Sequence, residues 1–138
     1  MQVLKQKIGK SLGLALGGML LGAGAAWADA HGNDLVHSRA FGGQVYMMYT
    51  DHMSLYTFSE DPLNASTCYD DCAVEWPPAI LDSGAELGEN YSLIERRDGL
   101  FQAAYKGQAL YLSSKDRRPG DINGDGIDAR WQLARPDS

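Results

Sequence analysis

The chain has 138 residues with 18 acidic and 12 basic side chains, which gives a formal charge of −6 at neutral pH. This length allows one domain of ordinary size. An acidic surface repels phosphate backbones and anionic lipid head groups, so the composition argues against nucleic acid or a membrane surface as a partner and leaves polycations and metal cations as candidates.

Residues 1–28 have the organisation of a secretory signal peptide. Three lysines form a basic start, residues 12–26 are an apolar run, and Ala26-Trp27-Ala28 has the small-x-small form that signal peptidase cleaves. The apolar run is short and rich in Gly, whereas a membrane-spanning helix needs roughly 20 apolar residues. We therefore expect residues 1–28 to be removed and no stable membrane anchor to remain.

The mature protein, residues 29–138, is more acidic than the whole chain. Three of the twelve basic side chains leave with the signal peptide, so nine face eighteen acidic ones and the formal charge is −9. No Cys precedes Cys68, which leaves no residue for lipid modification at the cleavage point. The sequence thus predicts a periplasmic or secreted protein.

The mature chain starts with a polar stretch, residues 29–41, which has no countable period and is typical of a flexible leader. Gly42-Gly43 then introduces two runs rich in aromatic and other β-favouring residues, 44–50 and 53–58, separated by Asp51-His52. We predict two strands joined by a tight turn.

A similar plan follows later in the chain. The pattern predicts a turn at Arg97-Asp98-Gly99, a strand over 100–105, a two-residue hairpin turn at Lys106-Gly107 and a strand over 108–113. Between the two regions, Pro77, Pro78 and Gly84 disfavour a long helix. We expect the short apolar segments 73–76 and 128–133 to add closing strands.

Two stretches of the chain match at one constant spacing, called here the repeat offset, which pairs Leu55 with Leu110. Leu55-Tyr56-Thr57-Phe58-Ser59-Glu60-Asp61 corresponds to Leu110-Tyr111-Leu112-Ser113-Ser114-Lys115-Asp116, and a Trp follows each Asp at the same distance, Trp76 in the first copy and Trp131 in the second. A match of this kind without a gap indicates an internal duplication. We therefore predict an all-β fold, in which a small single domain over 42–138 is built from two β-hairpin repeats, about 42–84 and 91–136, on one core.

Further motifs extend this pattern and together resemble a bacterial family. They are Tyr56-x-Phe58-x-x-Asp61, Cys68-x3-Cys72-Ala73-x2-Trp76-Pro77-Pro78, Tyr105-Lys106-Gly107-x2-Leu110-Tyr111, and Arg118-Pro119-Gly120-Asp121 with Gly124-x-Gly126 and Trp131. Over about residues 43–136 the chain resembles the predicted lipoproteins with a Tyr-x-aromatic-x-x-Asp motif, also described as secreted repeat proteins of unknown function. The resemblance implies export and duplication and leaves the chemistry open.

The chain departs from the family pattern at three points. It has no Cys at the cleavage point, so the lipid anchor typical of the family is absent and a soluble periplasmic protein is implied. Ser113 stands where the motif has an aromatic residue, and Ala109 stands where the family usually has Pro before Leu-Tyr. We expect these two changes to loosen packing locally and to leave the fold unchanged.

Cys68 and Cys72 are the only cysteines of the chain. In an oxidising export compartment two such thiols most often pair, so we expect a disulfide, which would stabilise the fold by about 2 kcal/mol because the closed loop is short. The alternative is a copper site, since thiolates suit Cu(I). Its further donors would come from Met47, Met48, His52 and Met53. Neighbouring strand residues face opposite sides, so Met47 and Met48 line one site only if the strand has a bulge.

Residues 121–128 match the opening of a calcium loop. The candidate ligands are Asp121, Asn123, Asp125 and Asp128. Oxygen ligands at alternate positions followed by Gly126 are what such a loop requires, but its twelfth position is Gln132, which lacks the closing carboxylate and predicts weak affinity. The alternative is a turn between strands that side-chain to backbone hydrogen bonds stabilise.

Asp61 and Asp116 form a duplicated acidic pair, but each follows a strand, where a carboxylate commonly accepts backbone N–H groups. The chain has no phosphate loop, paired-histidine zinc motif or recognisable triad, and its three His leave little for proton transfer. We predict an exported, non-enzymatic structural or ligand-binding module. The alternative is a periplasmic protein that binds Ca²⁺ or copper.

Overall fold

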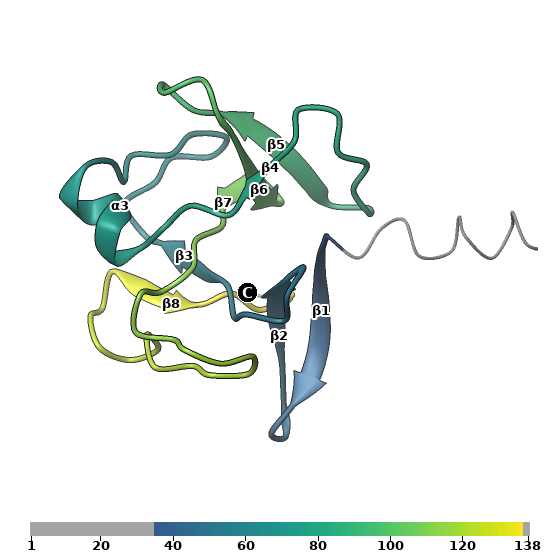
Figure 1. Cartoon of the computed structure of the whole chain (residues 1–138), viewed down its shortest axis with the longest axis vertical. Helices are drawn as coiled ribbons and strands as arrows, with labels where there is room; N and C mark the ends of the chain where they lie inside the picture. The colour runs from purple at the N-terminus through teal and green to yellow at the C-terminus, as the bar shows by residue number, and fades with distance from the viewer. Residues whose placement is uncertain (1–34, 137–138) are drawn as a thin grey trace, which may run out of the picture. The chain divides into compact units, whose positions relative to one another are not determined.

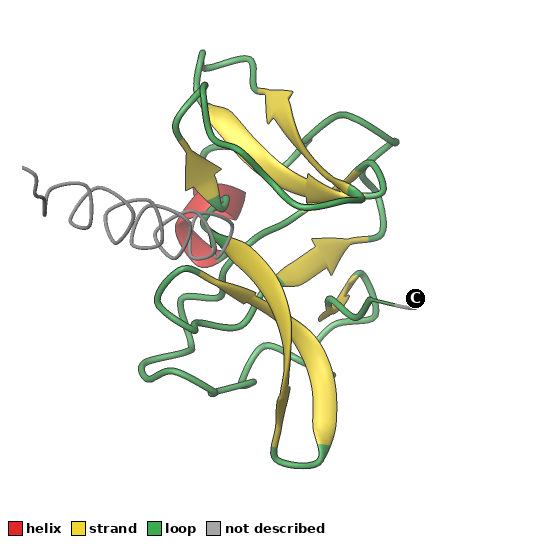
Figure 2. Cartoon of the chain, turned by 90° about the vertical axis from the view of Figure 1, so that its right-hand side faces the viewer, coloured by secondary structure: helices red, strands yellow, loops and turns green. Residues whose placement is uncertain are grey.

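The computed structural model describes residues 35–136 (Figures 1 and 2). The strands, in chain order, are β1 (Val36–Phe41), β2 (Gln44–Tyr49), β3 (Tyr56–Phe58), β4 (Ile80–Leu81), β5 (Tyr91–Glu95), β6 (Phe101–Tyr105), β7 (Gln108–Ala109) and β8 (Trp131–Leu133). Within these residues the all-β prediction is confirmed, and no helix there is long and apolar enough to cross a membrane. The predicted signal peptide, 1–28, and residues 29–34 of the predicted leader lie outside the described part.

The first hairpin begins earlier than the sequence predicts. β1 pairs antiparallel with β2 along its whole length. Gly42 and Gly43 form the turn between them at φ 59° and 84°, a conformation that Gly adopts without strain and that two-residue hairpin turns need. The predicted flexible leader 29–41 is therefore wrong for residues 36–41. Val36 is the one buried residue of this strand, so its sequence shows no alternating apolar pattern.

The hairpin predicted after β2 forms only at its start. The chain turns at His52, whose N–H donates to the Tyr49 carbonyl (2.8 Å), and Met48 makes an antiparallel bridge with Ser54. β3 then leaves β2 and pairs antiparallel with β8. The Leu55 N–H still donates to the Met47 carbonyl (3.0 Å), so the predicted pairing is wrong only beyond Leu55, where a strand from the far end of the chain pairs with β3.

The second region follows its prediction more closely. β5 and β6 are antiparallel neighbours joined through the predicted turn at 97–99, and β6 lies within the predicted strand 100–105. Lys106 and Gly107, at φ 49° and 84°, form the hairpin turn to β7. β4 pairs with the other edge of β6. The predicted strand 108–113 is reduced to the two residues of β7, because the chain then turns towards β3.

The two predicted closing segments take different forms. β8 lies within 128–133, as predicted. Residues 73–76 do not form a strand, because the helix α3 (Asp71–Glu75) occupies most of this segment. A disulfide joins Cys68 to Cys72 with their Cα atoms 5.3 Å apart. In a strand, the Cα atoms of these two residues would lie about 13 Å apart.

The last segment of each half forms backbone hydrogen bonds with the other half. The Ser59 N–H donates to the Arg130 carbonyl (2.8 Å), and the N–H of its equivalent in the second copy, Ser114, donates to the Glu75 carbonyl (2.9 Å). The same relation holds for the bonds from Ala134 to Leu55 (2.9 Å) and from Ala79 to Leu110 (3.0 Å). Figure 1 shows the result for β8, which lies beside β3 although the two strands are far apart in the sequence.

The core is centred on aromatic rings from both halves. Trp76 and Trp131 stack with ring centroids 4.1 Å apart and planes 3° from parallel. Tyr56 meets Trp76 edge-on at 5.3 Å, Tyr111 meets Trp131 edge-on at 5.1 Å, and Phe58 stacks on Trp131. Such ring pairs contribute roughly 0.5–1.5 kcal/mol each beyond the area they bury. The equivalent surroundings of the two Trp support the predicted duplication, which itself stays a prediction.

Candidate functional site

The tyrosine and the aspartate of the repeated motif bind each other across the two halves. The Tyr56 hydroxyl donates to Asp116 Oδ2 (2.8 Å), and the Tyr111 hydroxyl donates to Asp61 Oδ2 (2.7 Å). All four side chains are buried. Burial, followed by the hydrogen bond to the Asp, raises the pKa of both tyrosines well above its usual value, so both hydroxyls remain donors throughout the neutral range.

The other oxygen of each carboxylate holds the loop that follows it. Asp61 Oδ1 accepts hydrogen bonds from the Thr67 N–H (2.8 Å) and hydroxyl (2.7 Å), and Asp116 Oδ1 accepts one from the Asn123 N–H (2.7 Å). Burial raises the pKa of Asp116 above its usual value. The protein's own donors therefore engage both carboxylates and tie the loops to the strands.

A buried arginine joins one of these Tyr–Asp pairs. Arg96 is 4% exposed, and its Nη1 donates to Ser66 Oγ (3.1 Å) and Gln102 Oε1 (2.8 Å), while its Nη2 lies 3.0 Å from Asp98 Oδ2. Ser66 Oγ in turn lies 2.7 Å from the Tyr111 hydroxyl oxygen. A buried cation needs such partners. Sequence reasoning missed this network, because Arg96 directly precedes the predicted turn 97–99 and the nearby Asp98 is its one local signal.

The structure places the predicted copper ligands in different parts of the fold. Cys68 and Cys72 form the predicted disulfide, so neither presents a thiolate. Both cysteines pack in the core cluster around the two Trp, whereas Met47 packs in a second cluster. His52 and Met53 lie in the turn that follows β2. The predicted copper ligands are therefore not assembled in one place.

The predicted calcium ligands are engaged within their own loop. The Arg117 and Arg118 N–H groups bond Asp121 Oδ2 (3.0 and 3.1 Å), the Leu133 N–H bonds Asp125 Oδ1 (3.1 Å), and Asp128 forms an ion pair with Arg130 (2.9 Å). These contacts lower the pKa of Asp121 and of Asp128. Over residues 35–136, no group of three or more His, Cys, Asp or Glu is placed to hold a metal ion. The loop fits the turn alternative, and calcium binding stays a prediction.

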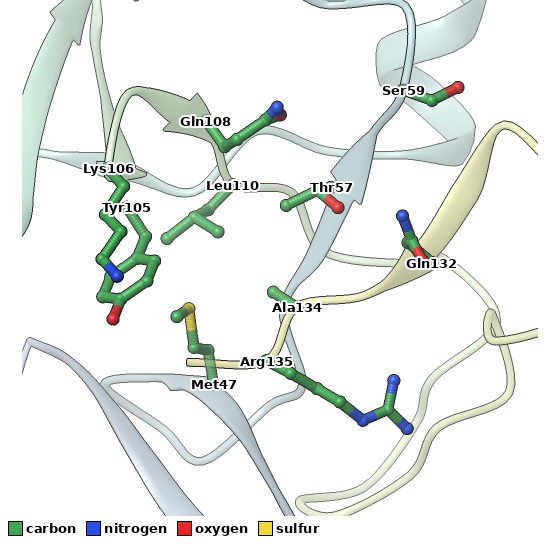
Figure 3. A pocket seen from close by; sticks show the side chains of 10 residues that line it. All are labelled: Met47, Thr57, Ser59, Tyr105, Lys106, Gln108, Leu110, Gln132, Ala134 and Arg135. Carbon is green, nitrogen blue, oxygen red and sulfur yellow. The ribbon is translucent and has the colours of Figure 1, made fainter. Parts of the chain in front are cut away.

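A cavity of about 350 Å³ lies where β3 and β8 meet the turn between β6 and β7 (Figure 3). Its apolar lining comes from Met47, Leu110 and Ala134. The other lining residues offer hydroxyl, amide or cationic groups and are Thr57, Ser59, Tyr105, Lys106, Gln108, Gln132 and Arg135. The lining includes no Asp or Glu, so its two charged side chains, Lys106 and Arg135, are both cations.

The two cations lie on opposite sides of the cavity (Figure 3). Lys106 Nζ lies 5.4 Å from the centre of the Tyr105 ring. Arg135 Nη2 donates to Gln44 Oε1 (2.7 Å) and lies 4.0 Å from Asp125 Oδ2. Sequence reasoning missed this cavity because its lining comes from separate segments of both halves. The sequence pattern indicates only a turn at Lys106.

Comparison with known proteins finds a family similarity over part of the chain. No curated protein and no solved structure matches the chain. Residues 92–135 match the model of a family described as a secreted repeat of unknown function. The matched segment covers the strands and the loop of the second half, and the first half of the predicted resemblance lies outside it. Residues 92–135 are therefore similar to the secreted repeat family of unknown function that the sequence resembles.

Proposed function

We propose that this protein is an exported, non-enzymatic module that binds a small anion with an apolar part in the cavity between its two halves. The observation that carries the proposal is a cavity whose lining combines two cationic side chains with amide, hydroxyl and apolar groups. A volume of about 350 Å³ lies at the lower end of the range of roughly 300–1,000 Å³ for ligand pockets. Because the chain as a whole is acidic, a small anion is a better fit than a polyanion such as nucleic acid.

Part of the polar lining is not a property of the repeat. The residues related by the repeat offset to Thr57, Gln132 and Arg135 are Leu112, Pro77 and Ile80, all of them apolar. The fold therefore accepts apolar side chains at these positions. Polar and cationic side chains that the fold does not require are what we expect of a binding site.

The same lining supports a binding role over a catalytic one. Among the lining residues there is no His, Cys, Asp or Glu, which are the usual general bases and strong nucleophiles. Ser59 and Thr57 have no such base beside them in the cavity lining. Amide and cationic groups beside apolar side chains orient and hold a ligand.

Titration with hexanoate, followed by amide chemical shifts, tests this proposal. Hexanol is the uncharged match, and low ionic strength limits screening of Lys106. We expect hexanoate, and not hexanol, to shift the amides of Gln108, Leu110 and Ala134 in a saturable way. Shifts that are equal for both compounds, or that lie away from the cavity, would contradict the proposal.

Lys106→Asn is the matched variant, because Asn tolerates the left-handed conformation (φ 49°) of this turn position. We expect it to weaken hexanoate binding at least fivefold. Lys115→Asn removes the same charge from an exposed position outside the cavity lining and should leave binding unchanged. Equal losses in the two variants would mean that net charge, and not this cavity, attracts the anion.

A further inference from the structure

His52 has a left-handed backbone conformation, which Gly adopts more easily than His. Its φ is 67°, in the left-handed region that disfavours side chains larger than Gly. The residue that the repeat offset pairs with His52 is Gly107, at φ 84° in the corresponding turn. Gly would remove the strain at this position, so the turn itself does not require the His52 side chain.

The His52 ring lies against a second imidazole. The ring centroids of His37 and His52 are 5.3 Å apart, and their planes are 81° from parallel. Two imidazoles that share a tetrahedral metal ion, with metal–nitrogen distances of about 2.0–2.1 Å, have ring centres about 5 Å apart. His37 Nδ1 is shielded from solvent and has no hydrogen-bond partner among the described residues. The pair thus has the spacing of two ligands, and one of its nitrogens is unused.

A thioether lies beside this pair. Met48 is directly opposite His37 in the β1–β2 ladder, so the two side chains lie on the same face of the hairpin. Met48 also lines a cavity of about 180 Å³ together with His52. Both methionines are buried: Met48 packs in the core cluster around the two Trp, whereas Met47 faces the other side of the strand and packs in the second core cluster. Strand alternation therefore selects one of the two neighbouring methionines.

The Arg39 guanidinium contacts the Nε2 atom of the His52 ring. Its Nη1 lies 2.5 Å from His52 Nε2, and because a guanidinium only donates, this nitrogen is the acceptor and carries no proton. An unprotonated imidazole nitrogen is the form that binds a metal ion. Arg39 is exposed, so a metal ion could displace it into solvent, although its charge competes with that ion.

We propose that His37, His52 and Met48 form a binding site for Cu(I). Imidazole suits several first-row metals, and a thioether is a soft donor that selects Cu(I) among them. The site is separate from the anion cavity and does not use Cys68 or Cys72. It differs from the copper site predicted from the sequence because it adds His37 and leaves out the two cysteines, Met47 and Met53.

Competition of the protein with bicinchoninate for Cu(I) measures this site. Ascorbate keeps the copper reduced and leaves the disulfide intact, which a thiol-specific mass measurement verifies. We expect one equivalent of Cu(I) and a shift of the Met48 methyl resonance. His52→Gly should lower the affinity at least tenfold and raise the melting temperature of the copper-free protein, since it removes the strained φ. A purely structural role of His52 would instead lower that temperature.

Two matched pairs of variants locate the ligands. Met48→Leu should weaken Cu(I) binding, whereas Met47→Leu, on the opposite face of the same strand, should leave it unchanged. His37→Gln should abolish binding, whereas His31→Gln should not. Arg39→Gln should strengthen binding several-fold, because it removes the competing cation. The proposal is overturned if the wild type binds no Cu(I) under ascorbate, or if His52→Gly and His37→Gln both bind it as the wild type does.

Discussion

The loops that separate Asp from Trp in the two halves have the same length but are built differently. The first, residues 62–75, contains the disulfide and α3. The second, residues 117–130, contains neither, and the residues related by the repeat offset to Cys68 and Cys72 are Asn123 and Ile127. Its bends are held by aspartate side chains that accept backbone N–H groups.

The two loops share their anchors and differ in their interiors. Each is tied to the preceding Asp by a backbone N–H, from Thr67 in the first loop and Asn123 in the second, and a Tyr from the other half binds the same Asp. The anchors are therefore what the fold requires, while a covalent bond and a set of polar turns are alternative ways to fill the span between them. This explains why the calcium-like motif fits a turn.

The largest effect that we predict comes from adding a methyl group to the second loop. A Cβ at Gly124 would lie 2.9 Å from Trp76 Cη2 and 3.0 Å from Ser113 Oγ. Trp76 cannot retreat because it stacks on Trp131, so Gly124→Ala should cost about 3 kcal/mol of unfolding free energy in urea titrations. Gly84→Ala, where a Cβ meets nothing within 4 Å, is the control and should change stability by less than about 0.5 kcal/mol. Equal effects would mean that the second loop does not pack against the core as described.

The next effect separates the two Tyr–Asp anchors. Tyr56→Phe leaves both Asp116 Oδ2 and the buried Gly124 N–H without their partner, so we expect a loss of about 2 kcal/mol. Tyr111→Phe should cost about half as much, roughly 1 kcal/mol, because Ser66 keeps its bond from Arg96. Urea unfolding of both variants measures the difference. A larger loss for Tyr111→Phe would show that the Arg96 network, and not the loop backbone, dominates this region.

The disulfide should stabilise the fold no more than the Tyr56–Asp116 anchor does. Replacing Cys68 and Cys72 together by Ala reopens a loop with a sequence separation of only 4, and the chain-entropy estimate for so short a loop is at most about 2 kcal/mol. We expect faster amide exchange in α3 and unchanged exchange at Asn123. If exchange also rises at Asn123, the two loops unfold as one unit and the comparison between them fails.

The sequence predicts local features of this fold better than distant ones. The Lys106-Gly107 turn, β6 and the disulfide follow from patterns within a few residues. β1 was missed because five of its six residues are not buried and show no alternation. The pairing of each half's last segment with the other half was missed, because packing across the whole chain decides which strand pairs with which. The same reason hides the cavity, where Lys106 and Arg135 meet only after both halves have folded.

Acid should act on the second loop through two opposite effects. Hydrogen bonds from the Arg117 and Arg118 N–H groups lower the pKa of Asp121. Its contribution to stability is therefore complete above its unfolded pKa, near 3.8, and is lost as the pH falls through the lower folded pKa. Burial raises the pKa of Asp116, so protonation of Asp116 stabilises the folded state as the pH falls from neutral towards 4.

Stability should consequently rise slightly between pH 7 and pH 4 and fall below it, which is the smallest effect in this series. Asp116→Asn should remove the rise, and Asp121→Asn should reduce the later fall without abolishing it, because Asp128 and Asp98 also have lowered pKa values. Urea midpoints at pH 7, 5, 4 and 3 measure both changes. The disulfide of the first loop does not titrate, so amide exchange below pH 4 should rise in residues 117–130 before it rises in residues 62–75. The reverse order would mean that the polar turns hold their loop more firmly than the covalent bond holds its counterpart.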